Sequence, residues 1–518
     1  MISNLTVFFV ILWAFTIFSG EKIAFWMPSY FTCSWPPIYA TDNPGDYVKI
    51  AVITDPQLMD RTSLPLAPKS LILEIIQFYT DIYMRRAMLS SIMPFKPDMV
   101  LFLGDYFDGG PVLSDEEWQD SLNRFRHIFD LKTIEKATNN QVYFLSGNHD
   151  IGYSGYHSKI PKVISRYEKA FGSRNYNFTA GAVEFVVVDA QTIDGRPQQN
   201  QTSATWKFVN SVSTDYQSRP RVLLTHIPLY RPDSTPCGPR RSSPIIDQRI
   251  SRASDDRDIV YQNYLTEKTT NMLLDSIKPV LVLSGHDHDQ CTVTHIAEHG
   301  PVVEQTLGTI SWQQGNLYPS FMLLTASKLA YSNASETVST QLCSLPAQIF
   351  IYFWYIVLFV VTLAVVLLWP TNGLGIHLRI GELVSNTLAV FKSTKVKDDD
   401  ENCDYEMVWD AEGSMHLIKK ASKIAPSRST ERIERGNATM RSAAKKQIMQ
   451  EINVTMPQDV SSQLGPDASA KLGPFKTNKS SVRLVIQRLL RVFQVLSVVA
   501  AVNVPIYIML LFSDWIDK

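Results

Sequence analysis

The 518-residue chain carries almost no net charge, since 49 Lys and Arg offset 50 Asp and Glu. This balance gives no reason to expect nucleic acid as a partner. The five cysteines include no Cys-x-x-Cys pair, which argues against a four-cysteine zinc site. Residues 513–518 form a short tail without a Lys-Asp-Glu-Leu-type retrieval signal. The informative features are instead a few sharply apolar segments and a series of short polar blocks.

Three apolar segments predict membrane-spanning helices, for which about 20 residues suffice. No basic run precedes the first segment and no small-x-small site follows it. We therefore expect a transmembrane signal anchor at residues 1–26 rather than a cleaved signal peptide. The second span is expected at 346–370. The third, at 484–512, contains Pro505, which a membrane helix tolerates, and its alternative is an amphipathic interfacial helix.

The segments between these spans differ in character. Residues 371–483 are polar, with an acidic run at 398–401, and are predicted to be largely disordered and cytosolic. Residues 27–345 would then form a lumenal domain. The glycosylation sequon occurs in both segments and does not fix the topology by itself: it is found at Asn177, Asn200, Asn333, Asn437, Asn453 and Asn478.

Five polar blocks lie along residues 55–288, and each follows a short apolar run that predicts a buried strand. The runs are 48–54, 99–103, 142–145, 222–224 and 280–283. Periodic segments at 70–93, 115–137 and 158–170 predict helices between several of them. This alternation indicates an α/β sheet covered on both faces, with the blocks at the carboxyl ends of its strands. The blocks are Asp55-Pro56-Gln57, Gly104-Asp105-Tyr106-Phe107-Asp108, Gly147-Asn148-His149-Asp150, Thr225-His226 and Gly285-His286-Asp287-His288.

The residue types in these blocks suit a two-metal phosphoesterase. Two divalent metals about 3.5–4 Å apart clamp the attacking and leaving oxygens of a phosphoryl displacement and lower the pKa of a bound water. Such a site needs one bridging carboxylate, for which Asp105 is the candidate, and further oxygen and imidazole ligands. Asp55 and His288 would complete one metal, and Asn148, His226 and His286 the other.

The block order resembles that of the calcineurin-like metallophosphoesterases. The longer strings DPQLMD (55–60), GDYFDGG (104–110), GNHDIG (147–152), HIPLYR (226–231) and GHDHDQC (285–291) resemble one branch more closely. This branch comprises membrane-bound, GPI-anchor-remodelling ethanolamine-phosphate phosphodiesterases, also called cell-division-control-type metallophosphoesterases. The resemblance covers about residues 47–325. It implies a four-layer α/β/β/α sandwich flanked by transmembrane helices, with two divalent metals and Mn²⁺ as the expected ion.

The resemblance also implies a function. The chain would remove ethanolamine phosphate from a mannose of the GPI glycan in the ER or Golgi, and so support maturation and transport of GPI-anchored proteins. GPI-anchored proteins or the GPI glycolipid would be substrates, with cargo receptors as candidate partners. Two alternatives stay open: an esterase for another lumenal phosphoester, and a non-catalytic membrane protein of manganese homeostasis. His149 and Asp150 favour an enzyme, because metal binding alone requires no acid.

His149 is the candidate general acid, and Asp150 would hold its ring in the productive tautomer. The alternative for His149 is a turn residue beside Asn148. Asp108 would either orient the bridging carboxylate or a metal-bound water, or cap the helix expected near Ser114.

Gln57 stands where most calcineurin-like enzymes have a histidine. The side-chain carbonyl of glutamine can bind a hard metal such as Mn²⁺, so we expect an intact site. The alternative is that Gln57 lies beside the ligands and that one metal is held weakly.

The long segment between His226 and Tyr261 lacks apolar periodicity and holds six arginines. Long loops within compact domains are usually functional, so this one is expected to form a wall of the substrate cleft. Arg231 and Arg240 are its candidates for binding substrate phosphate or for supporting the metal ligands, and a solvated loop of mixed charge is the alternative. A disulfide between Cys237 and Cys291 would pin this loop to the site, unless Cys291 is a reduced core residue.

Two further stretches are expected to be structural. The aromatic residues of 312–321 are predicted to belong to the core of the closing strands, with a sugar-contacting cleft wall as the alternative. His295 and His299 follow the last block and are expected to be solvent-exposed strand or turn residues rather than ligands.

Overall fold

A computed structural model describes residues 4–37, 44–65, 70–139, 141–155, 160–215, 219–253, 258–329, 337–369, 405–409, 415–419 and 479–516. The chain divides into two compact units, and the fold below belongs to the first, Met1–Ile376 with Met407–His416 and Leu489–Lys518. The polar segment predicted at 371–483 lies outside the described residues, apart from the paired strands β14 (Tyr405–Trp409) and β15 (Met415–Lys419) and the start of α14 (Lys479–Trp515).

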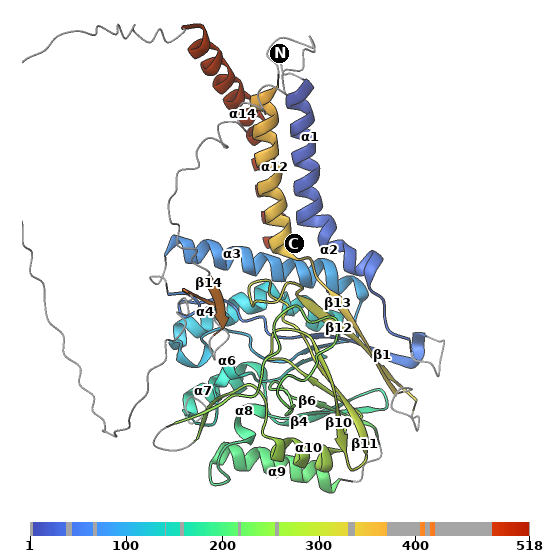
Figure 1. Cartoon of the computed structure of the whole chain (residues 1–518). Coiled ribbons are helices and arrows are strands. Elements are labelled where there is room, and N and C mark those ends of the chain that lie inside the picture. The colour runs from blue at the N-terminus through green and yellow to red at the C-terminus, as the bar shows by residue number, and fades with distance from the viewer. Residues whose placement is uncertain are drawn as a thin grey trace, which may run out of the picture. The chain divides into compact units, whose positions relative to one another are not determined.

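Two mixed sheets form the centre of the first unit (Figure 1). In the five-stranded sheet the order is β13 (Val338–Ser344), β12 (Ser320–Ser327), β1 (Tyr47–Ile53), β2 (Met99–Phe102) and β3 (Val142–Phe144). In the six-stranded sheet the order is β10 (Cys291–Ala297), β11 (Gly300–Thr306), β9 (Leu281–Ser284), β6 (Arg221–Leu224), β5 (Val183–Val187) and β4 (Tyr176–Ala180). The strands β1, β2 and β3 are parallel, as are β5, β6 and β9. A short hairpin of β7 (Ile250–Arg252) and β8 (Ile259–Gln262) is separate.

Three apolar cores give this part of the molecule four layers. In β1, Ile50 and Val52 point into the core between the two sheets, whereas Ala51 and Ile53 point into the core beneath the helices. This period of two is what a strand buried on both faces requires. The helices on the five-stranded sheet are α3 (Leu71–Arg86), α4 (Asp115–Ile128), α5 (Leu131–Ala137) and α7 (Pro161–Phe171). Those on the six-stranded sheet are α8 (Ala190–Ile193), α9 (Asn200–Thr214) and α10 (Glu267–Ile277). The predicted α/β/β/α sandwich is confirmed.

The helix predicted at 115–137 is in fact two helices. Its start is fixed by a capping box, in which Ser114 Oγ accepts from Glu117 N and the Glu117 carboxylate accepts from Ser114 N. The chain turns at Asp130, whose φ of 45° is left-handed and ends helical hydrogen bonding between α4 and α5. Periodicity does not reveal this break, because both helices bury the same face.

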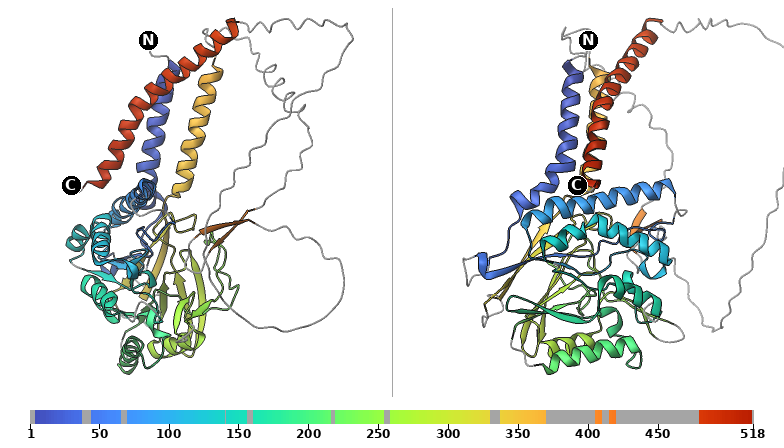
Figure 2. Two further views of the ribbon diagram at one scale, coloured as in Figure 1. Left: turned by 90° about the vertical axis from the view of Figure 1, so that its left-hand side faces the viewer. Right: turned by 180° about the vertical axis from the view of Figure 1, so that it is seen from behind.

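Within the described part of the chain, three helices are long and apolar enough to cross a membrane: Asn4–Thr32, Gln348–Leu368 and Val482–Trp515. The first starts at α1 (Asn4–Phe18) and extends beyond the predicted boundary at 26. The second is α12, and the third lies within α14. Figures 1 and 2 show α1 and α14 ending, and α12 beginning, on the side of the sandwich that α3 covers.

A buried ionic cluster joins these helices to α3. The guanidinium of Arg86 donates to the carboxylates of Glu21 and Asp514, and its Nε lies 2.8 Å from Asp514 Oδ2. Tyr355 Oη of α12 donates to Glu21 Oε1 over 3.0 Å. Breaking one partner of a buried ion pair costs about 3–5 kcal/mol, so the cluster fixes the domain against all three long helices.

Candidate metal centre

The polar blocks meet where parallel strands of both sheets end. Asp55 follows β1, Asp105 follows β2, and Asn148 opens the short helix α6 (Asn148–Ile151) after β3. From the other sheet, His226 follows β6, and His286 and His288 follow β9. Carboxyl ends of parallel strands are the usual ligand-binding edge of α/β sheets.

Two groups of side chains could each hold a metal ion. One consists of Asp105, His226 and His286, and the other of Asp55, Asp105 and His288. Within each group the candidate ligand atoms all lie within 4.8 Å of one another. Asp105 belongs to both groups, as expected of a bridging carboxylate. The grouping matches the ligand sets expected from the sequence, and Asn148 joins the first group because its Oδ1 lies 3.1 Å from His226 Nε2.

Backbone carbonyls fix which ring nitrogen each histidine offers. His226 Nδ1 lies 2.7 Å from Leu103 O, which leaves Nε2 facing Asp105 Oδ2 at 3.2 Å. His286 Nε2 lies 3.1 Å from the carbonyl of Gln262, which leaves Nδ1 free. Such outer hydrogen bonds orient the imidazoles of metal sites and select their tautomers. The donor set is therefore arranged as a metal site requires.

Positive backbone φ angles are concentrated at the centre. Five of the seven candidate ligands have positive φ values: Asp55, Gln57, Asp105, His286 and His288. Non-glycine residues rarely adopt this conformation, and it persists where the surroundings impose it, typically at functional sites. Gly147 allows the close approach, since a Cβ there would lie 2.0 Å from Asp105 Oδ1.

Burial and neighbouring charges shift the pKa values of the site residues in different directions. Burial raises the pKa of Asp55 to about 7. Burial lowers the pKa of His286 to about 3 and that of His288 to about 4, so both are neutral and able to bind a metal. Burial also disfavours charge on His226, but the Asp105 carboxylate more than offsets this and raises its pKa to about 9. A cation would replace these protons.

We expect metal affinity to rise with pH. The pKa of His226 lies near 9, so at pH 7 its ring must lose a proton before Nε2 can bind a metal. The pKa of Asp55 lies near 7, so below that pH its carboxyl group must also lose a proton before it can bind a metal. For each proton that must be released, the apparent affinity for the metal rises about tenfold per pH unit up to the pKa of that group. The rise is therefore steepest below pH 7, where both groups release a proton, and ends near pH 9. Isothermal titration with Mn²⁺ in buffers of different ionisation enthalpy measures both affinity and protons released; a flat profile would contradict this assignment.

Gln57 lies among the candidate ligands rather than apart from them. Its Nε2 is 3.1 Å from Asp105 Oδ2 and 3.0 Å from His288 Nε2, and the residue is buried. Turning the amide by 180° would place Oε1 at the same point. The structure thus puts Gln57 where a carbonyl ligand of the metal shared by Asp55 and His288 would stand.

His149 stands beside the centre, but its partner differs from the expected one. Asp150 at the third position of α6 accepts from the backbone N–H groups of Asp105 and Gly147, each over 2.8 Å, and from Tyr106 N over 2.9 Å. The His149 ring instead points its Nδ1 at the carbonyl of Asp108, whose carboxylate is 3.5 Å away. Adjacent helical residues do not face each other, which explains why Asp150 holds the Asp105 backbone and not the His149 ring.

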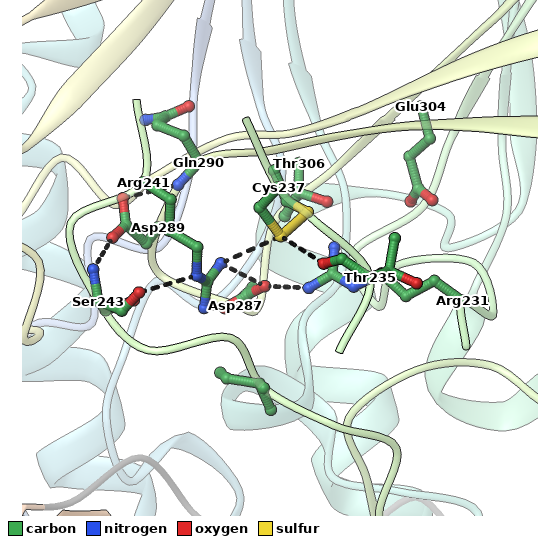
Figure 3. Close-up of a disulfide and its surroundings, with 12 residues drawn as sticks. Arg231, Thr235, Cys237, Arg241, Ser243, Asp287, Asp289, Gln290, Glu304 and Thr306 are labelled. Atoms are coloured by element: carbon green, nitrogen blue, oxygen red, sulfur yellow. Dashed lines mark hydrogen bonds and ion pairs between the residues drawn. A yellow bond between two sulfur atoms is a disulfide. The ribbon is translucent and has the colours of Figure 1, made fainter. Parts of the chain in front are cut away.

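The arginine-rich loop contacts Asp287, the residue between His286 and His288 (Figure 3). Arg231 is only 1% exposed, and its Nη2 donates to Asp287 and to Tyr264 Oη. Arg241 donates to the same carboxylate through Nη1 and Nη2, over 2.9 and 2.7 Å. Of the two roles that the sequence left open for Arg231, these contacts favour support of the residues beside the metal ligands over contact with substrate. Arg240 is exposed and lines a cavity of about 470 Å³ with Gln290 and Tyr318 among others, so it remains the substrate candidate.

Asp287 was not singled out from the sequence, although it lies between His286 and His288. We expect Asp287→Asn to lower Mn²⁺ affinity by about 10–100-fold, the usual cost of losing a group that orients metal ligands. Excess Mn²⁺ should restore activity, since the residue touches no substrate. The matched control is Asp289→Asn, whose carboxylate accepts from neutral donors of Ser242, Ser243 and Gln290. Equal loss in both variants would contradict a specific role of Asp287.

Two disulfides tie the domain together. Cys237 is bonded to Cys291, which attaches the arginine-rich loop to β10 just after the last ligand block, as Figure 3 shows. Cys33 is bonded to Cys343 of β13, a pair that spacing alone does not reveal because 310 residues separate them.

The two later histidines are not at the centre: His295 Nε2 contacts Glu304 and His299 Nε2 contacts Pro279 O. Of the aromatic stretch, Phe321 is core, whereas Trp312 borders a cavity beside the long helices.

Comparisons with known proteins show what this region of the chain is similar to. Residues 48–290 match the sequence profile of the calcineurin-like phosphoesterases. Cell division control protein 1 of Saccharomyces cerevisiae is 28% identical over 62% of this chain and 66% of its own length. Metallophosphoesterase 1 of Mus musculus is 28% identical over 57% and 73%, and the Drosophila melanogaster homologue is 28% identical over 57% and 76%. A purple acid phosphatase from yellow lupin aligns with a TM-score of only 0.33, at 11% identity over 58% of this chain and 55% of that one.

The matched region contains every candidate ligand and the strands that carry them. Its sheets, its shared carboxylate and its histidines are those of a metal-dependent phosphoester hydrolase. The chain therefore contains a calcineurin-like metallophosphoesterase domain.

Proposed function

We propose that this chain is a membrane-anchored phosphodiesterase that uses two Mn²⁺ ions to remove ethanolamine phosphate from a mannose of the GPI glycan. The observation that carries the phosphodiesterase is the pair of ligand groups sharing Asp105, with the His149 ring beside them. The carboxylate, amide and imidazole donors suit Mn²⁺, which favours oxygen and nitrogen ligands. The GPI glycan is supported by the extended motif strings and by the membrane helices that would confine enzyme and substrate to one surface.

The residues around the metals have separate tasks in this proposal. Bound metals supply an activated water and neutralise charge on the phosphoryl oxygens. Although burial alone would lower the pKa of the His149 ring, Asp105 and Asp108 raise it to about 9, so the ring holds a proton at neutral pH. His149 can therefore give that proton to the leaving alkoxide, while the Asp108 carbonyl keeps Nδ1 oriented. Asp150 fixes the backbone of Asp105 and so the position of the shared carboxylate.

We propose that the domain faces the lumen of the ER or Golgi. Both disulfides lie in the part of the chain between the first two long helices or at its borders, which suits an oxidising compartment. The sequon residues Asn177 and Asn200 are exposed on the same domain. The helix ends at Glu21 and Asp514 meet at Arg86, which supports a topology in which these helices leave the membrane on the side of the domain. Endoglycosidase digestion of Asn177→Gln and Asn200→Gln variants tests this orientation.

The decisive experiment uses the full chain in detergent, stripped of metal and reloaded with Mn²⁺. GPI glycans that carry ethanolamine phosphate on defined mannoses are incubated with it, and the mass loss of that group is followed. Loss from one mannose only is the expected result. If simple phosphodiesters are hydrolysed but the glycans are not, the GPI assignment is wrong. If neither is hydrolysed although Mn²⁺ is bound, the catalytic proposal itself is wrong.

A further inference from the structure

A cavity of about 660 Å³ lies at the junction between α3 and the three long helices. Its walls are almost wholly apolar and aromatic. The long helices contribute Trp13, Tyr352, Phe359 and Val499, among others, and the sandwich contributes Ile75, Tyr79 and Trp312. Cavities of this size and composition usually bind small or chain-like apolar ligands. We call it the junction cavity.

The junction cavity lies at the level where a bilayer would meet the domain. On α3, Leu71, Ile72 and Ile75 are 71%, 60% and 47% exposed, which gives this helix an apolar flank next to the long helices. Trp26 and Tyr30, just beyond the first long apolar run, are also exposed. Exposed apolar flanks and aromatic residues beside membrane spans mark the interfacial layer of lipid headgroups. Ile75 and Phe359 line the cavity and keep nearly half their surface accessible, so the cavity is not sealed.

One short loop connects the junction cavity to the metal centre. Thr309 N donates to His288 O over 3.1 Å, and Thr309 Oγ1 donates to Asp55 O over 2.5 Å. Trp312 follows three residues later and lines the cavity. Three residues span at most about 11 Å even when fully extended. The part of the cavity wall that Trp312 forms is therefore within about 11 Å of chain from a residue that contacts the backbone of two candidate metal ligands.

A polar atom at this end of the cavity lacks a partner. Trp312 Nε1 is buried without a hydrogen bond to any described residue. Buried indole N–H groups usually find an acceptor. A ligand with an ester or hydroxyl oxygen next to an apolar chain would supply that acceptor. A lipid has this polarity, because its chain ends in an ester or amide and then in the headgroup.

We propose that the junction cavity binds an acyl chain of the lipid that anchors the substrate, so that the enzyme recognises a lipid-linked phosphodiester. This inference rests on the proposed phosphodiesterase function. The bound acyl chain holds the lipid end of the substrate in the membrane plane. The headgroup then extends past Trp312 toward the metals. The gain is a higher effective concentration of the phosphodiester at the site.

Two adjacent alanines of α14 provide a matched test. Ala500 lines the junction cavity, whereas its exposed neighbour Ala501 does not. The measured quantity is the ratio of kcat/KM on a lipid-linked glycan bearing ethanolamine phosphate to kcat/KM on the same glycan after its lipid is cleaved off. The phenyl ring of Ala500→Phe should exclude at least about two methylene groups of the acyl chain from the cavity, which should lower this ratio by about tenfold. Ala501→Phe should keep the wild-type ratio. An unchanged ratio in Ala500→Phe, or equal losses in both variants, would overturn the proposal.

Photolabelling keeps this test apart from the test of the function. Two probes carry the same photoreactive acyl chain, one on a phosphatidylinositol-anchored glycan and the other on phosphatidylcholine. The glycan probe should label cavity-lining peptides of α12 and α14 more strongly, and Ala500→Phe should reduce this labelling. Equal labelling by both probes would show a site for bulk lipid and overturn the proposal. If the glycan is labelled selectively but not hydrolysed, the catalytic proposal fails and the lipid site stands.

Discussion

Replacing Asp105 by asparagine is expected to abolish hydrolysis while the protein stays folded. Asp105 contributes to both ligand groups, so the substitution removes a charged ligand from two metals at once. The isosteric amide keeps the volume of a side chain that is fully buried. Two-metal sites derive their activated water and their charge neutralisation from the ions. We expect kcat/KM to fall by at least about 10⁴-fold, within the range that metal-dependent catalysis provides over the uncatalysed reaction.

The control for this variant lies at the other end of the same strand. Asp98 precedes β2, is exposed, and accepts a hydrogen bond from Lys49 N over 2.9 Å. Asp98→Asn makes the same chemical change without touching the site, so its activity should stay close to that of the wild type. Metal content by mass spectrometry should drop from two ions per chain in Asp105→Asn only. Full metal content together with full activity in Asp105→Asn would refute the bridging role.

The ligands could be predicted because their signal is local. Each block follows its own strand in the sequence, and parallel strands must bring their carboxyl ends to one edge. Asp55, Asp105, His226 and His288 therefore needed only the strand assignments to be placed together. The position of Asp105 also depends on strand order: it follows β2, which lies between β1 with Asp55 and β3 with Asn148.

The supporting contacts were not predictable, because they join residues that no local pattern relates. Arg231 and Arg241 reach Asp287 from a loop without periodicity, so no pattern in the sequence relates either arginine to this carboxylate. The pairing of Arg86 with Glu21 and Asp514 spans almost the whole chain. The role of Asp150 depends on the direction in which its side chain leaves the single turn of α6. Sequence spacing does not reveal how the side chains of two adjacent residues are oriented.

His149→Asn is expected to lower kcat by about 10²–10⁴-fold, the usual contribution of a general acid. Metal content should be unchanged, because His149 is in neither ligand group. The loss should depend on the leaving group. On a diester of p-nitrophenol, whose anion leaves without protonation, the variant should approach the wild type. A residue that merely supported the fold would lower both reactions equally. His299→Asn, which changes a histidine bonded only to Pro279 O in the described structure, is the matched control.

The pH profile gives an independent reading of the same role. A general acid must be protonated, so wild-type kcat should fall as pH rises through the pKa of His149. Among the protein groups alone this pKa is about 9, because Asp105 and Asp108 outweigh the effect of burial. Bound cations neutralise Asp105, so the alkaline limb should lie below that value in the metal-loaded enzyme. His149→Asn should lose this limb and keep the acidic one, where protons compete with metal at Asp55 and His226. An alkaline limb that persists in the variant would assign the proton donor to another group.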